Sequence, residues 1–172
     1  ILMLLVLFSY CSDSDDPIKT GTPDTENIVL KVYAEVAEAE IPIKMDDQYE
    51  IDLFGNISSC NLSDDACFSI TGIIREPNAS GDFLLEEGEL RLSSSTAGCD
   101  LWGQFTGEGS KDGTFFSINS DVEVTCGTGA FESDGGKLKM TITGNLPSEN
   151  HPYMSYELSL YGQIERKVSI VN

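Results

Sequence analysis

Few residues in this chain could do catalytic chemistry. His151 is the only histidine, and Pro152 follows it in a predicted loop, so a solvent-facing histidine is expected there instead of the base of a nucleophile. Carboxylate pairs for glycoside hydrolysis could be drawn from several predicted strands: Glu86, Glu87, Glu89, Asp100 and Glu123. In a chain with 29 acidic residues such pairs arise by abundance. We therefore predict no catalytic residue.

Metal binding has one candidate. Calcium takes carboxylate and carbonyl oxygens, and the pairs Asp46 with Asp47 and Asp64 with Asp65 lie in predicted loops. No complete calcium-loop motif is present, so a site would have to assemble from separate loops, and solvated acidic turns are the alternative. Structural zinc is not expected, because the chain has no Cys-x-x-Cys pair and its one histidine is far in sequence from every cysteine. We predict no cofactor, with calcium as the candidate ion.

Aromatic residues fall on the polar phase of several predicted strands. They are Tyr33, Phe54, Trp102, Phe115 and Tyr161. In a single-layered barrel they would face outward, where an aromatic patch would suit a glycan or a partner protein. The alternative is that a loop, or residues 43–45, covers them. Our candidates for surface binding are Trp102, Tyr33, Phe115 and Tyr161.

The charge of the chain excludes one class of partner. Against 29 acidic residues there are 10 Lys and Arg, which gives a formal net charge of -19. Such a charge repels the phosphates of nucleic acids and anionic lipid surfaces. We therefore expect no nucleic-acid partner, and we interpret the charge chiefly as a source of solubility in a salty or crowded exterior.

Alternation of apolar and polar residues runs through the chain from residue 28. It is found at residues 28–36, 49–53, 68–74, 83–92, 99–105, 116–126, 138–142 and 156–164. Turn-forming residues separate these runs, and no long helical period occurs. A helix competes only at residues 32–40, where Pro42 would end it early. The pattern predicts an all-β fold: a single antiparallel β-barrel of about eight strands, with a β-sandwich as the runner-up.

A glycine motif lies between the sixth and seventh predicted strands. It consists of Gly127, Gly129, Phe131 and Gly136, after an earlier segment at residues 113–116. The first two glycines would allow positive φ, Phe131 would plug the end of the core, and Gly136 would start the next strand where a side chain would collide. Residues 113–164 resemble the allene oxide cyclase-like and dirigent-like barrels. The resemblance implies the barrel fold and no catalytic position, since such barrels include cyclases, non-catalytic stereochemical guides and secreted domains.

The first residues predict where the protein resides. Residues 1–8 are apolar, like the core of a secretory signal, and too few to span a bilayer, which takes about 20. With Cys11 and the acidic residues 12–16, they resemble the signal of a Bacteroidota surface lipoprotein, although Tyr10 stands where such signals usually carry a small residue. The resemblance implies a truncated signal peptide at residues 1–10, a lipidated Cys11 heading a flexible acidic tether at 11–27, and a β-barrel domain at 28–172.

Four further cysteines fit an exported protein. With Cys11 set aside, an even number remains, which indicates two disulfides among three pairings. Cys60 and Cys67 could clip the base of a hairpin loop. Cys99 and Cys126 share the core phase of two strands joined by a glycine turn at residues 107–113, so we favour that pair over the crossed alternatives.

These observations predict a binding protein at the cell surface. We expect a lipid-anchored protein of the outer membrane whose barrel binds a small apolar ligand, a glycan or a protein partner without catalysis. The alternative is an isomerase or cyclase acting on a small apolar substrate inside the barrel. A pocket of several hundred cubic ångströms with convergent polar groups would favour the enzyme, and a barrel filled by side chains would count against it.

Overall fold

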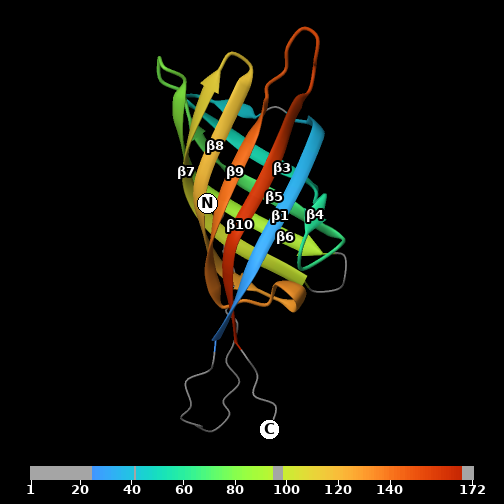
Figure 1. The fold of residues 1–172 in the computed structure, drawn as a ribbon. Helices are drawn as coiled ribbons and strands as arrows, with labels where there is room; N and C mark the ends of the chain where they lie inside the picture. The colour runs from blue at the N-terminus through green and yellow to red at the C-terminus, as the bar shows by residue number, and fades with distance from the viewer. Residues whose placement is uncertain (1–24, 41, 95–98, 168–172) are drawn as a thin grey trace, which may run out of the picture.

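The computed structural model describes residues 25–40, 42–94 and 99–167. In this part of the chain ten strands form one antiparallel sheet, and a short helical turn, η1 (Gly129–Phe131), precedes β9 (Figure 1). The long strands are β1 (Thr25–Ala39), β3 (Gln48–Asn56), β5 (Ala66–Arg75), β6 (Asp82–Ser94), β7 (Cys99–Asp112), β8 (Phe115–Gly127), β9 (Gly135–Asn145) and β10 (Met154–Lys167). The short ones are β2 (Ile43–Met45) and β4 (Ser59–Cys60).

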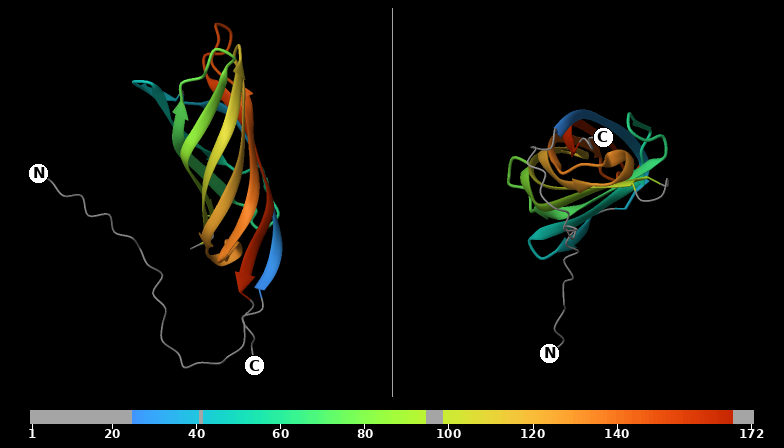
Figure 2. Two further views of the ribbon diagram at one scale, coloured as in Figure 1. Left: turned by 90° about the vertical axis from the view of Figure 1, so that its left-hand side faces the viewer. Right: turned by 90° about the horizontal axis from the view of Figure 1, so that it is seen from below.

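The sheet curls on itself without closing. Its strand order is β2-β3-β5-β6-β7-β8-β9-β10-β1-β4, so most sequence neighbours pair and the last strand returns to the first. Seen from below, the strands curl around a common axis (Figure 2). The all-β antiparallel class is therefore confirmed. The ladder does not return from β4 to β2, so the structure is a half-barrel and not the closed barrel that we predicted.

The free edge of β1 is taken by a neighbouring segment, which explains why the barrel stays open. β4 pairs with Val32 and Tyr33 of β1. The Asn61 side chain then continues the pairing: its carbonyl oxygen accepts from the Lys31 amide at 2.7 Å, and its amide donates to the Val29 carbonyl at 2.8 Å. These groups occupy the backbone edge of β1. β3 therefore finds no unpaired edge there with which to close the sheet.

The inward phases of the strands form one hydrophobic core. Its members include Leu30, Val32, Ile51, Leu53, Ile70, Leu90, Leu101, Phe105, Ile118, Val122, Leu138, Met140, Leu158 and Leu160. The competing helix at residues 32–40 is absent, because β1 continues the same alternation to Ala39. Across the open seam, the Tyr156 hydroxyl donates to the Phe54 carbonyl at 3.1 Å, and burial raises the pKa of Tyr156 to about 12.

Inward-facing glycines on β6 and β7 make room for aromatic rings. A Cβ on Gly109 would meet the ring of Phe83, and a Cβ on Gly88 of β6 would meet the ring of Phe105. β7 therefore runs on through residues 107–109, where we predicted part of the turn. The chain reverses at Gly113, whose φ is +60°.

Neither predicted disulfide is formed. Cys60, Cys67 and Cys126 are free thiols. β4 carries Cys60 to β1, whereas β5 carries Cys67 to an exposed position, so the two do not face each other across a hairpin. Cys126 lies opposite Trp102, beside a register shift between β7 and β8. The side chain of Cys99 lies outside the described part of the structure.

The segment containing η1 closes one end of the core. Phe131 is fully buried there. Gly129 has a φ of +60°, whereas Gly127 is needed for space, because a Cβ would meet the carbonyl oxygen of Phe131. Gly136 combines a φ of +143° with a close approach to the backbone of Gln163. Three glycines thus let the chain turn over the core and place one ring in it.

The predicted targeting segments cannot be placed in the fold. Cys11, the signal at residues 1–10 and most of the tether lie outside the described residues. β1 begins at Thr25, slightly before the predicted start of the domain. Among the described residues, no helix is long and apolar enough to cross a membrane.

Candidate functional site

The residues considered for catalysis are spread over the surface. His151 is exposed in the loop between β9 and β10. The Glu86 carboxylate pairs with Arg75 at 2.9 Å, and the Asp100 carboxylate pairs with Arg91 at 3.1 Å. These two carboxylates thus link neighbouring strands on the outer wall. The remaining candidates, Glu87, Glu89 and Glu123, are exposed.

The two calcium candidates also remain separate. Asp46 and Asp47 lie in the turn between β2 and β3, and Asp64 and Asp65 lie in the loop between β4 and β5. Asp65 accepts a hydrogen bond from Ser94 at 2.7 Å. In the described ranges, no three His, Cys, Asp or Glu side chains gather as a metal site would require.

The interior is filled with apolar side chains. Ser120 and Ser133 are the only polar side chains buried among the described residues. A cavity of about 160 Å³ remains at the end of β8 opposite η1, between residues such as Ile51, Phe116 and Met154. Ligand pockets of enzymes usually measure several hundred cubic ångströms and contain convergent polar groups. This cavity is smaller and apolar.

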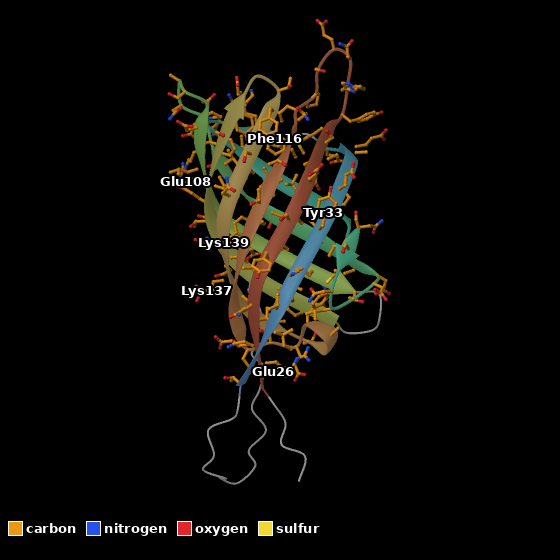
Figure 3. The ribbon with its side chains drawn as sticks, viewed as in Figure 1. Glu26, Tyr33, Glu108, Phe116, Lys137 and Lys139 are labelled. Carbon is orange, nitrogen blue, oxygen red and sulfur yellow. The ribbon has the colours of Figure 1, made fainter. Side chains whose placement is uncertain are left out.

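Two of the four predicted surface aromatics lie close together in the sheet, and the other two lie apart from them. Tyr33 on β1, labelled in Figure 3, and Tyr161 on β10 are both exposed on the outer wall. They are diagonal neighbours in the sheet, because residue 33 pairs with residue 159. Trp102 is half-buried on β7, with the Arg91 guanidinium 5.5 Å from its ring centroid. Phe115 begins β8 near the other end of the sheet. Residues 43–45, the segment that could have covered these aromatics, form β2. This strand pairs with the edge of β3, and its side chains are exposed.

A hollow of about 880 Å³ lies on the outer wall beside Tyr161, over β8, β9 and β10. We call it the Tyr161 groove. Gly135 has no side chain on the outward phase of β9, and a Cβ there would find no atom closer than 3.9 Å, so the wall is open at this point. The polar residues lining the groove are Asn27, Asp121, Glu123, Asp134, Lys137, Lys139, Gln163 and Glu165.

Three lysines lie near the Tyr161 ring. In the strand register Tyr161 lies between Lys31 of β1 and Lys139 of β9. The Lys31 ammonium is 5.7 Å from the ring centroid, a cation–π contact, and the Lys139 ammonium is 3.0 Å from a carboxylate oxygen of Asp121. Lys137 follows on the same outward phase (Figure 3). The wall therefore carries both signs of charge, because Asp121, Glu123, Asp134 and Glu165 line the same groove.

The nearby Tyr33 remains a neutral hydrogen-bonding group. Desolvation raises the pKa of its phenol, and the carboxylates of Glu157 and Glu35 raise it further.

Alternation predicts that the lysines of this wall lie on the polar phase, but it does not identify them as site residues. The pairing of β10 with β1, which a pattern within single strands does not reveal, brings them together.

Comparison of the chain with protein-family models, curated proteins and solved structures found no match. The resemblances to surface lipoproteins and to allene oxide cyclase-like barrels therefore stay predictions.

Proposed function

We propose that this protein is a non-enzymatic glycan-binding domain, anchored in the outer membrane by a lipid on Cys11 and exposed at the cell surface. The Tyr161 groove supports the binding role: an aromatic residue that is 57% exposed lies beside a hollow lined by carboxylates, amides and ammonium groups. The lipoprotein-like segment at residues 1–16 supports the location.

A glycan requires two kinds of contact, and the groove has both. The Tyr161 ring offers an apolar face to the C–H side of a sugar, and its hydroxyl offers a polar edge. Glu123 can accept hydrogen bonds from sugar hydroxyls, Lys137 can donate them, and Gln163 can do both. These groups lie on three neighbouring strands, so the sheet holds them in fixed relative positions.

The alternative function, an isomerase or cyclase acting inside the barrel, has less support. Apolar side chains fill the interior, and the end cavity is small. Among the described residues that line this cavity, only Tyr49 and Lys111 have polar side chains, so few polar groups converge on a substrate there. We therefore propose binding without turnover.

Glycan binding can be tested with the purified full-length chain on an array of neutral and acidic glycans, followed by titration of the best ligand. We expect Tyr161→Ala to weaken binding by at least about fivefold, since aromatic stacking contributes about 1 kcal/mol beyond buried area. Tyr153→Ala is the matched control, because Tyr153 is 55% exposed but lies near the opposite end of the sheet. A chain that binds no glycan, or unchanged binding by Tyr161→Ala, would contradict the proposed role.

The anchor needs its own test. Mass spectrometry of the amino terminus of the native protein is expected to find diacylglycerol on Cys11, and Cys11→Ser is expected to release the protein from the membrane fraction. A chain with no lipid at Cys11 would contradict the proposed location. The proposed glycan binding would be unaffected, because the glycan array tests it separately.

A further inference from the structure

The end cavity has a well-defined chemical character. Its volume is about 160 Å³. It lies at the upper end of the sheet in Figure 3, where Phe116 is labelled, and away from the end that Phe131 fills. The lining residues are Pro42, Tyr49, Ile51, Leu53, Ile74, Pro77, Phe83, Lys111, Phe116, Ile118, Leu146 and Met154. Apart from Tyr49 and Lys111, every one of them has an apolar side chain.

Lys111 occupies an unusual position for a lysine. Residues 101, 103, 105, 107 and 109 of β7 face the core, and Lys111 continues the same phase at the end of the strand. Its register partner on β8 is Phe116, a core residue. The stem of Lys111 therefore lies along the apolar lining, while its end reaches solvent, as long charged side chains commonly do.

The Lys111 ammonium makes no ion pair or hydrogen bond within the described part of the chain. The other lysine near this end, Lys44, is already paired with Glu76 at 2.9 Å. With 29 acidic residues available, an unpaired cation at the rim of an apolar cavity leaves a place for an anion brought by a ligand.

The size of the cavity limits the ligand. Apolar cavities of about 150 Å³ in protein cores stay dry and admit a molecule the size of benzene. We propose that the end cavity binds small monocarboxylates with an apolar body of about this size, such as benzoate or hexanoate. The ring or alkyl chain enters between Ile118 and Met154, and the carboxylate faces the Lys111 ammonium. This site is separate from the Tyr161 groove and does not depend on the glycan proposal.

Nuclear magnetic resonance of the full-length chain tests the site with benzoate and benzene as probes. Both are expected to shift the methyl signals of Ile118 and Met154, because both would occupy the same cavity. Lys111→Met keeps the length of the stem but removes the charge. It is expected to weaken benzoate binding about tenfold, as loss of a charge-assisted contact does, while benzene binding changes less than twofold.

Two further variants complete the experiment. Lys137→Met, on the outer wall, should leave both probes unaffected, and Ile118→Phe should abolish binding of both by filling the cavity. The proposal is overturned if benzoate does not shift the Ile118 and Met154 signals at millimolar concentration. It is equally overturned if Lys111→Met binds benzoate as the wild type does.

Discussion

The two ends of the half-barrel are built differently. At one end a turn of the chain folds over the core and inserts Phe131, which is fully buried. Neighbouring strands hold this turn: Arg166 donates to the Ala130 carbonyl at 2.9 Å, and the Thr128 amide donates to the Asp100 carbonyl at 2.7 Å. At the other end, separate loops surround the cavity, and no single side chain fills it.

The difference shows that curled strands alone do not fill a barrel. The strands at both ends alternate in the same way, yet only the end with an aromatic ring inserted along the axis is packed. The loops at the cavity end are each tied at the rim, for example by the Leu146 amide to the Thr114 carbonyl at 2.7 Å. Such bonds hold the rim in place and leave the space between the loops open.

The largest expected effect comes from removing the ring at the closed end. Phe131→Ala should lower the free energy of unfolding by about 3–5 kcal/mol, as for other buried Phe truncations. Phe116→Ala, at the cavity end, should cost less, because that ring borders empty space and has fewer atoms to contact. Denaturant unfolding of both variants measures the difference. Phe115→Ala, on the exposed phase, is the control and should change stability by less than about 0.5 kcal/mol. Equal losses for the two buried rings would contradict the contrast between the ends.

Alternation within strands was enough to predict the strands and the sides they present. Leu138 and Met140 face the core and Lys137 and Lys139 face solvent, because one face of the sheet is buried and the other is wet. The same rule misled at β7, where glycines at 107 and 109 were interpreted as a turn. Glycine has no side chain to mark its phase. A Cβ on Gly109 would meet the Phe83 ring, and a Cβ on Gly107 would meet the Ser120 side chain, so the strand interior needs both glycines.

Features that depend on strand order could not be predicted. The contact of Tyr161 with Lys31 requires the last strand to pair with the first. The open edge of the barrel depends on Asn61, whose carboxamide bonds the backbone of β1 where another strand could pair. The alternation of apolar and polar residues does not reveal such a side-chain contact. Lys111 shares the inward phase of β7, but its role follows only from the loops that leave a cavity beside it.

Enlarging core residues gives a second, smaller contrast between the ends. Leu101→Phe, beside Gly127 at the closed end, should destabilise the protein by about 1–3 kcal/mol, because no space is available for the larger side chain. Ile118→Phe should cost less than about 1 kcal/mol, since the cavity of about 160 Å³ can accept the ring. Thermal unfolding of both variants in one buffer checks the order. If Ile118→Phe were the more damaging change, the cavity would not be free to accept a side chain.

The smallest expected effect is the loss of stability at low pH that comes from Asp100, at the closed end. Partial burial would raise the pKa of Asp100, but hydrogen bonds from Ser93 and Arg91 and the charge of Arg91 outweigh it, and the pKa is lowered from its ordinary value of 3.8. The carboxylate thus stabilises the fold above that value, and the contribution is lost as pH falls through the lower folded pKa. Unfolding midpoints between pH 6 and about 2 should fall more steeply in the wild type than in Asp100→Asn. Glu76→Gln removes an exposed ion pair at the cavity end and should change the midpoints little at any pH, because such pairs contribute little to stability. Parallel curves for the wild type and Asp100→Asn would show that this carboxylate does not contribute to the stability of the closed end.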